Sequence, residues 1–427
     1  MVLKLPPLPQ RNDLVHPLSE DIDELDNEAK RLMERIGQKM RWSLDACRTI
    51  APLTLKINRL KKEKDVILIA HTYQTPDIVY GVADAVGDSY TLSKIARDAP
   101  QSVILFSSVR FMAETAKIVS PHKTVLHPSP EAGCSLSDGI TAQDVRDLKA
   151  QYPGIPVACY INTTAAVKAE CDVSVTSSNY LQICERLPGE RLIFVPDRFM
   201  GAHLQKALAG KKEVIVFDGE CEVHAVFTGD KVREWKQRIG ENLTVLAHPE
   251  CSAEVLEEAD FIGSSEKLIH EAIRLGVEGQ PDVMLITECG TAERVLAETE
   301  VELNLYGACV MCRYMKATQL EDILQAMQNP RPDQIIEIES DGIGVQVPLS
   351  DHRDLVTGIA EELGEGLLLA VKVGRVVVEK TVQVAVLAGQ DVGAGRAADG
   401  IGAEGILKKH ALIRDSVDIR GGSNIVE

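Results

Sequence analysis

The middle of the chain repeats itself with a period of about 88 residues. Three apolar runs, DVILIAHTYQ, IPVACYINTT and LTVLAHPECS, each end in polar residues, as a buried strand would. The first polar residues after these runs lie 89 and then 88 positions apart: His71, Tyr160 and His248. The tripeptide Arg-Phe-Met also recurs after 88 positions, at 110–112 and 198–200. This shared spacing indicates three copies of one structural unit between about residues 51 and 327.

Each copy also carries a serine where a helix is expected to start. The segments VGDSYTLSKIARDA, VTSSNYLQICERL and IGSSEKLIHEAIRLG supply Ser89, Ser177 and Ser265, again 88 positions apart. Serine at such a point is typical of a helix N-cap, because its hydroxyl accepts a hydrogen bond from an unpaired backbone N–H. Helix N-termini also attract anions, so these serines are candidate binding residues for a carboxylate or a phosphate.

The alternation of short apolar strands with helices predicts an α/β fold. We expect three pseudo-equivalent three-layer αβα domains with parallel sheets, arranged around a pseudo-threefold axis. The carboxyl ends of parallel strands carry the chemistry in such folds, so the repeated polar residues should meet in one central active-site cavity. The predicted domains are an N-terminal helical extension (1–50), three α/β repeats (51–140, 141–227 and 228–335) and a C-terminal extension of unknown role (336–427).

One cysteine stands in the corresponding loop of each repeat. Cys134, Cys221 and Cys312 are separated by 87 and 91 positions. Three thiolates suit a soft metal centre, and a 4Fe–4S cluster held by three would keep one iron open as a Lewis acid. Cys309, in the sequence CVMC, could be a fourth ligand that closes the site, or a small buried residue beside Cys312. A zinc or redox role for this CxxC is a further alternative.

Charge and composition restrict the partners. The net charge of −18 and the aromatic content of 4% disfavour nucleic-acid binding. No apolar run is long enough to span a bilayer, and prolines occupy the start of the chain where a signal peptide needs apolar residues. We therefore expect a cytoplasmic protein without a membrane partner. Its ten cysteines should then be reduced, most of them as buried structural residues and not in disulfides.

Many short segments of the chain resemble the quinolinate synthase family, and they occur in the family's order over roughly 270 residues. The cysteine segments are PEAGCSLSD, GECEVH and CRYMKATQLEDIL. The others are HTYQ, VGDSYTLS, RFMAETAKIVSP, YINTTAAVKA, VTSSN, PDRFMG, HPEC and ADFIGSS. The chain departs from the family pattern at Thr72, where tyrosine or asparagine is usual, and at Arg110, where histidine is common. Neither change removes a presumed ligand.

The resemblance implies an activity and a set of site residues. Members of this family condense iminoaspartate with dihydroxyacetone phosphate to give quinolinate, using a 4Fe–4S cluster whose ligands would here be Cys134, Cys221 and Cys312. Residues matching the substrate-binding positions are His71, Ser89, Tyr160, Asn162, Ser177, His248, Glu250, Ser264 and Ser265. Tyr73 and Glu250 match the proton-transfer positions, and His224 joins them as a catalytic candidate. L-aspartate oxidase or aspartate dehydrogenase is the expected supplier of iminoaspartate.

Two other classes of function remain open at this point. A non-catalytic iron–sulfur sensor or electron carrier would use Cys309 as a fourth ligand, but it would not need so many polar side chains at the same loops. A metal-free sugar-phosphate enzyme could use Lys117 or Lys316 as a Schiff-base amine. That interpretation would leave the three repeated cysteines unexplained.

Overall fold

The computed structural model describes residues 21–37, 40 and 42–338. Residues 1–20 of the predicted N-terminal extension lie outside the described residues, as does the predicted C-terminal extension beyond its first three residues. Among the described residues, every helix is too short or too polar to span a bilayer.

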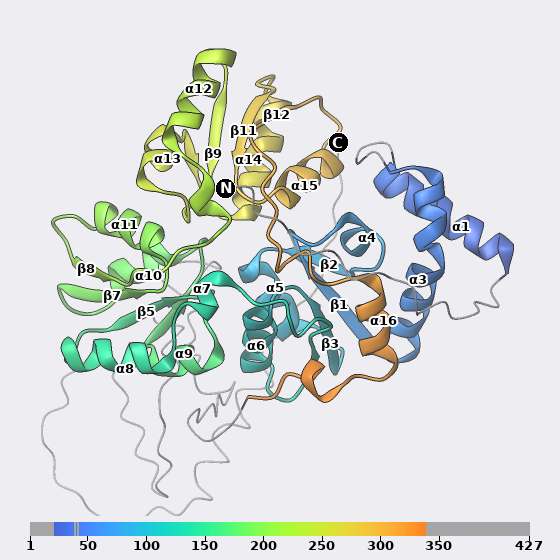
Figure 1. Cartoon of the computed structure of the whole chain (residues 1–427), viewed down its shortest axis with the longest axis horizontal. Coiled ribbons are helices and arrows are strands. Elements are labelled where there is room, and N and C mark those ends of the chain that lie inside the picture. The colour runs from blue at the N-terminus through green and yellow to red at the C-terminus, as the bar shows by residue number, and fades with distance from the viewer. Residues whose placement is uncertain (1–20, 38–39, 41, 339–427) are drawn as a thin grey trace, which may run out of the picture. The chain divides into compact units, whose positions relative to one another are not determined.

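Three four-stranded parallel sheets form the framework, and all three have the same strand order (Figure 1). The first has the order β2-β1-β3-β4, from β1 (Val66–His71), β2 (Ala85–Gly87), β3 (Val103–Ser107) and β4 (Thr124–Leu126). The second has the order β6-β5-β7-β8, from β5 (Val157–Tyr160), β6 (Val173–Val175), β7 (Arg191–Val195) and β8 (Glu213–Val216). The third has the order β10-β9-β11-β12, from β9 (Thr244–Ala247), β10 (Phe261–Ile262), β11 (Asp282–Ile286) and β12 (Asn304–Tyr306). The predicted α/β class with three equivalent parallel sheets is therefore confirmed.

Helices cover the sheets and bury their central strands. The first domain contains α4 (Pro76–Val79), α5 (Ser89–Asp98), α6 (Arg110–Val119) and α7 (Ser135–Asp138). The second contains α8 (Ala142–Gln151), α9 (Ala165–Glu170), α10 (Tyr180–Arg186), α11 (Arg198–Ala207) and η2 (His224–Val226). The third contains α12 (Gly229–Ile239), α13 (Ala253–Glu258), α14 (Ser265–Val277) and α15 (Gly290–Glu298). Because both faces are covered, strands such as β1, β5 and β9 are almost continuously apolar.

The helix starts differ by a few residues from the sequence prediction. Asp88 caps α5 through a hydrogen bond from the Thr91 N–H (2.9 Å), so Ser89 is the first helical residue. Ser264 is the N-cap residue of α14 and Ser265 follows it inside the helix. Ser177 lies in the turn before α10, whose N-cap residue is Asn179. The N-cap prediction for these three serines was wrong, and their hydroxyls are left for other contacts.

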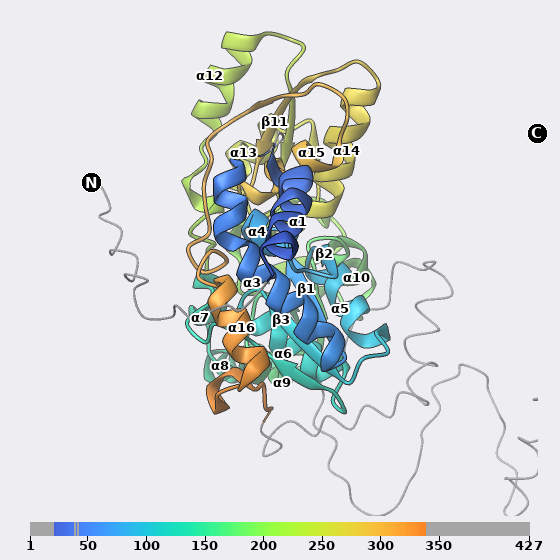
Figure 2. The same ribbon diagram turned by 90° about the vertical axis from the view of Figure 1, so that its right-hand side faces the viewer.

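The chain returns to the first domain after the third sheet. Helix α16 (Leu320–Gln328), followed by η3 (Pro332–Gln334), packs beside α3 (Leu44–Glu63) over one face of the first sheet, as Figures 1 and 2 show. Helix α1 (Ile22–Leu32), followed by η1 (Met33–Gly37), in turn packs on α3. A segment inside the predicted third repeat (228–335) thus completes the core of the first domain. The apolar side chains of α16 pack against those of α3 and the first sheet.

Shortening one side chain of α16 is expected to destabilise the first domain. Ile323 is fully buried between α3 and the first sheet. We expect Ile323→Ala to lower the free energy of unfolding by about 2–5 kcal/mol, because it leaves a cavity that the sheet cannot fill. Val277→Ala is the control, since Val277 is 69% exposed and its loss should cost no more than about 0.5 kcal/mol. If denaturant unfolding showed the same loss in free energy of unfolding for both variants, this packing role would be contradicted.

Candidate active site

The loops of all three domains line one cavity that is partly open to solvent. A cavity in which polar side chains of several loops converge is typical of sites for small molecules. All the predicted site residues but one line it: His71, Tyr73, Ser89, Cys134, Tyr160, Asn162, Ser177, Cys221, His224, His248, Glu250, Ser265 and Cys312. The exception is Ser264, which is fully buried beneath the start of α14, and its Oγ has no hydrogen-bond partner among the described residues.

The first and third domains present a histidine in the same local turn. His71 Nδ1 accepts a hydrogen bond from the Tyr73 N–H (3.1 Å), and His248 Nδ1 accepts one from the Glu250 N–H (3.4 Å). Burial lowers the pKa of each ring to about 3, so both are neutral at pH 7. With Nδ1 occupied as an acceptor, the proton of each ring resides on Nε2. Each histidine can therefore donate a hydrogen bond to a substrate oxygen.

These two histidines should make the fold sensitive to mild acid. Their folded pKa of about 3 lies below the usual histidine value of 6.5, so between these values the unfolded chain binds more protons than the folded one. Stability therefore falls as the pH drops below 6.5. At pH 5 we expect a combined loss of about 4 kcal/mol relative to pH 7. Urea unfolding at both pH values checks this, and His248→Gln should remove about half of the pH dependence. An unchanged pH dependence in that variant would contradict the assignment.

Glu250 is the central charged group of the cavity. Its Oε2 lies 2.7 Å from His224 Nδ1 and its Oε1 lies 3.4 Å from Asn162 Nδ2. Burial alone would raise the pKa of Glu250, but His224, the neighbouring His248 and the Tyr160 hydroxyl hold it at about 2. The side chain is 3% exposed. Glu250 is thus a buried, hydrogen-bonded carboxylate whose neighbours come from the second and third domains.

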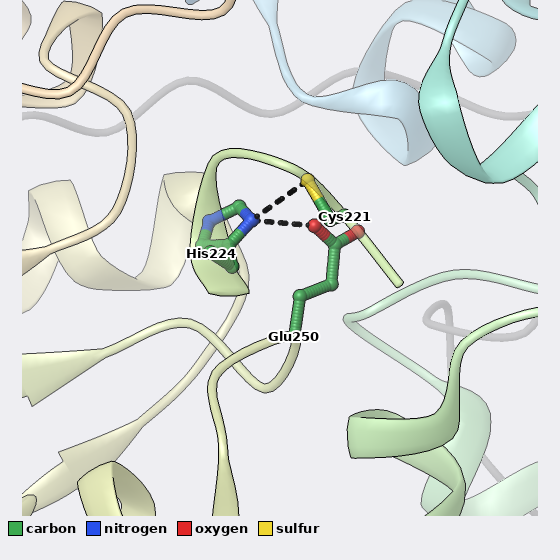
Figure 3. Close-up of side chains that lie close together, drawn as sticks. All are labelled: Cys221, His224 and Glu250. Carbon is green, nitrogen blue, oxygen red and sulfur yellow. Dashed lines mark hydrogen bonds and ion pairs between the residues drawn. The ribbon is translucent and has the colours of Figure 1, made fainter. Parts of the chain in front are cut away.

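Cys221, His224 and Glu250 converge, as Figure 3 shows. The Nδ1 of His224 contacts both of the other two, at 3.3 Å from Cys221 Sγ and 2.7 Å from Glu250 Oε2. One ligand atom from each residue falls within 4.8 Å of the others, a spacing that could hold a metal ion. The protein thus brings a thiol, an imidazole and a carboxylate to the same point of the cavity wall.

Tyr73 adds a hydroxyl on the opposite side of His224. Its Oη lies 2.7 Å from Ser265 Oγ and 2.9 Å from Thr287 Oγ1. Burial raises the pKa of Tyr73 far above its usual value, so the hydroxyl keeps its proton. Thr287 was not among the predicted site residues. The sequence could have indicated it. Thr287 is the first polar residue after the apolar run DVMLI, just as His71 and His248 are the first polar residues after their apolar runs.

The three repeated cysteines face the same cavity as free thiols. Cys134 precedes α7, Cys221 precedes η2, and Cys312 follows β12. Burial raises the pKa of all three, that of Cys312 to about 11. Three soft sulfur donors, one from each domain and none in a disulfide, fit a metal centre with three protein ligands. Such a metal centre would displace the thiol protons when it binds.

Cys309 does not join this group. It forms a disulfide with Cys289, with a Cα–Cα distance of 5.0 Å. This contradicts both the interpretation of Cys309 as a fourth ligand and the expectation that the chain has no disulfide. Strands β11 and β12 are parallel neighbours, and each cysteine stands three residues past the end of its strand, so the register brings them together. The other cysteines are buried free thiols, as predicted for most of them: Cys47, Cys159, Cys171, Cys184 and Cys251.

The two lysines considered as Schiff-base amines do not line the cavity. Lys316 Nζ donates to the Tyr73 carbonyl oxygen (2.7 Å) and pairs with Glu288 Oε1 (3.3 Å). Lys117 Nζ donates to the Lys123 carbonyl oxygen (3.0 Å). Both ammonium groups serve structural contacts, so this geometry does not favour the metal-free alternative.

Comparison with known proteins gives one consistent family. The family model described as "Quinolinate synthetase A protein" matches residues 55–344. A quinolinate synthase of Caulobacter vibrioides (strain NA1000 / CB15N) is 41% identical over 296 residues, which are 68% of this chain and 79% of that protein. A quinolinate synthase of Clostridioides difficile (strain 630) is 42% identical over 289 residues, covering 67% of this chain and 93% of that protein. A quinolinate synthase of Sinorhizobium fredii (strain NBRC 101917 / NGR234) is 39% identical over 288 residues, covering 67% of this chain and 78% of that protein.

Proposed function

This chain belongs to the quinolinate synthase family of NAD biosynthesis, and on that premise we propose that its cavity condenses iminoaspartate with dihydroxyacetone phosphate to quinolinate, releasing phosphate and water. The observation that carries the proposal is the cavity itself, in which three free cysteines meet Tyr73, His224 and Glu250. A sensor or electron carrier would need the cysteines alone.

The proposed cofactor is a 4Fe–4S cluster held by Cys134, Cys221 and Cys312. When bound with three protein ligands, such a cluster supplies a Lewis acid at its open iron. The fit rests on three free thiols, one from each domain, that line the same cavity. We also propose a cytoplasmic location, because the cluster needs the thiols of Cys134, Cys221 and Cys312 in reduced form. The Cys289–Cys309 disulfide lies outside this ligand set.

The remaining residues suit two anionic substrates. Ser89 and Ser265 stand in the first turns of α5 and α14, where backbone N–H groups and the helix dipole favour a carboxylate or a phosphate. Ser264 lies below the same helix start, and Ser177 supplies another hydroxyl on the cavity wall. His71, His248, Tyr160 and Asn162 provide further hydrogen-bonding groups on the wall. This ring of donors would hold two negatively charged molecules together against their repulsion.

Proton transfer falls to three side chains. The condensation must remove protons from carbon and nitrogen and deliver them to leaving oxygens. Glu250, ionised at neutral pH, is the proposed base, and Tyr73, which keeps its proton, is the proposed acid. His224 lies between them, with its Nδ1 paired to Glu250 Oε2 and its Nε2 in contact with Thr287 Oγ1, which is also a partner of the Tyr73 hydroxyl. Because iminoaspartate is short-lived in water, we propose L-aspartate oxidase or aspartate dehydrogenase as its supplier.

The test is an anaerobic assay of the purified full chain. We expect a brown protein with about four irons per chain. Given dihydroxyacetone phosphate and freshly generated iminoaspartate, it should form quinolinate, detected by chromatography against an authentic standard. A brown protein that forms no quinolinate would contradict the proposed reaction but not the cluster. A protein that stays colourless after anaerobic reconstitution would contradict the role of the three cysteines.

A further inference from the structure

The residue directly after each proposed ligand cysteine contacts the corresponding residue of another domain. We call these three residues the collar: Ser135 after Cys134, Glu222 after Cys221, and Arg313 after Cys312. None of the three side chains has a role in the proposed function. Because the repeat puts the cysteines in equivalent loops, it also brings these polar side chains together between the loops.

Ser135 links the first domain to the second. The Glu222 N–H donates to Ser135 Oγ (3.1 Å), and the Ser135 hydroxyl donates to the Glu220 carbonyl oxygen (3.4 Å). One hydroxyl thus contacts the main chain on both sides of Cys221. The position of Cys221 is therefore coupled to the start of α7, directly after Cys134.

The loop that presents the Ser135 hydroxyl is itself held in place. The Cys134 N–H donates to Asp138 Oδ2 (3.3 Å), and the Asp138 N–H donates to the Cys134 carbonyl oxygen (2.8 Å). These two hydrogen bonds enclose Ser135 between Cys134 and Asp138. The hydroxyl of Ser135 and the thiol of Cys134 therefore move together.

Glu222 links the second domain to the third. Its Oε2 lies 3.0 Å from Arg313 Nη2. The guanidinium group also stacks on the Tyr314 ring, with its central carbon 4.7 Å from the ring centroid. The side chains of Arg313 and Glu222 are 64% and 36% exposed, and such an ion pair is weak and screened by salt. This link should therefore contribute less than the two hydrogen bonds of Ser135.

We propose that the collar holds the three cysteine loops together and thereby slows the loss of the bound iron–sulfur cluster. The inference rests on the proposed function, because it needs Cys134, Cys221 and Cys312 as the cluster ligands. A cluster held by one thiolate from each domain is released only when a loop withdraws, and the collar contacts must break in that step. Removal of a collar contact should therefore speed the release of iron.

Ser135→Ala tests the first link. The measurement is the rate at which the anaerobic holoenzyme loses iron to an excess of a coloured ferrous chelator. We expect release about 3- to 10-fold faster than in wild type, the range for a lost hydrogen bond. Ser137→Ala is the matched control, because Ser137 lies on the same helix, is buried and is not part of the collar. Equal release rates in the two variants would overturn the inference.

A destabilised variant separates the collar from general stability. Ile323→Ala removes a buried side chain of the first domain away from the cavity. If release requires only the withdrawal of a loop, Ile323→Ala should release iron at the wild-type rate although it unfolds more easily. Faster release from Ile323→Ala than from Ser135→Ala would mean that global unfolding controls the loss, and this would overturn the inference.

The second link is tested by a double-mutant cycle. Glu222→Gln and Arg313→Gln should each speed release about two- to fivefold, and the double variant should lose iron no faster than either single variant. At about 1 M salt the wild-type rate should approach that of Arg313→Gln, because the ion pair is screened. Arg191→Gln is the control, since it breaks an exposed ion pair with Glu213 on the second sheet (2.9 Å). It should release iron at the wild-type rate.

The outcomes distinguish this inference from the proposed function. Multiplying effects of Glu222→Gln and Arg313→Gln, or an equal effect of Arg191→Gln, would refute the link between the second and third domains. A wild type that binds iron but whose collar variants release it at the wild-type rate would refute the inference alone. A wild type that takes up no iron after anaerobic reconstitution would refute the proposed cofactor, and the collar with it.

Discussion

Cys221→Ala is expected to abolish both the iron–sulfur absorbance and the formation of quinolinate. Cys221 is the thiol of the second domain in a set that takes one cysteine from each domain, so no neighbouring thiol of that domain can replace it at the cavity. Loss of a Lewis acid that contributes about 4 kcal/mol corresponds to a rate loss of about 10³-fold. Iron content, the visible spectrum and the quinolinate assay measure the two effects together.

Cys184→Ala is the control for the loss of a buried thiol. Cys184 is fully buried on α10 of the same domain, but it does not line the cavity. Its removal should cost about 1 kcal/mol of stability and leave iron content and turnover unchanged. Wild-type iron and turnover in Cys221→Ala, or equal losses in both variants, would refute the ligand role of Cys221.

The meeting of the repeated residues in one cavity could be predicted because it depends on spacing alone. Equal offsets from the ends of equivalent parallel strands place His71, Tyr160 and His248 at the same edge of each sheet. Because the chain runs through each domain in the same order, the adjoining turns and the cysteine loops lie at this edge as well. The repeat therefore predicted the fold class and three sets of residues that all line the cavity: the polar residues after the strands, the serines and the cysteines. Tyr73, Asn162, His224 and Glu250 were assigned from the family resemblance.

Other features depend on a choice between neighbouring residues or on contacts distant in sequence, and the spacing of the repeat predicts neither. Asp88 and Ser89 are both good N-cap residues, as are Ser264 and Ser265, so the sequence cannot decide which one caps its helix. The position of α16 follows from its apolar contacts with α3 and the first sheet, which lie far earlier in the chain. The Cys289–Cys309 pairing required the register of β11 and β12.

Glu250→Gln should lower kcat by about 10²- to 10⁴-fold, the range for loss of a general base, while KM changes little. The amide keeps the size of the side chain and still accepts the hydrogen bond from His224 Nδ1–H, so the cavity should keep its shape. What disappears is the ability to take up a proton. Steady-state kinetics with both substrates measures the change, and iron content should remain at the wild-type level.

Glu250→Gln should also change how the stability of the protein depends on pH in acid. The folded pKa of Glu250 is about 2 against the usual glutamate value of 4.5, so its ionisation stabilises the fold above pH 4.5, and this contribution is lost as the pH falls towards 2. Glu250→Gln should lack that part of the acid transition. The control is Glu28→Gln, which removes a buried carboxylate paired with Arg31 (2.7 Å) away from the cavity. Glu28→Gln should lose about 1–3 kcal/mol of stability with unchanged kcat. If Glu250→Gln instead lost stability while keeping its turnover, Glu250 would be a structural residue, and the proton acceptor would have to be another group on the cavity wall.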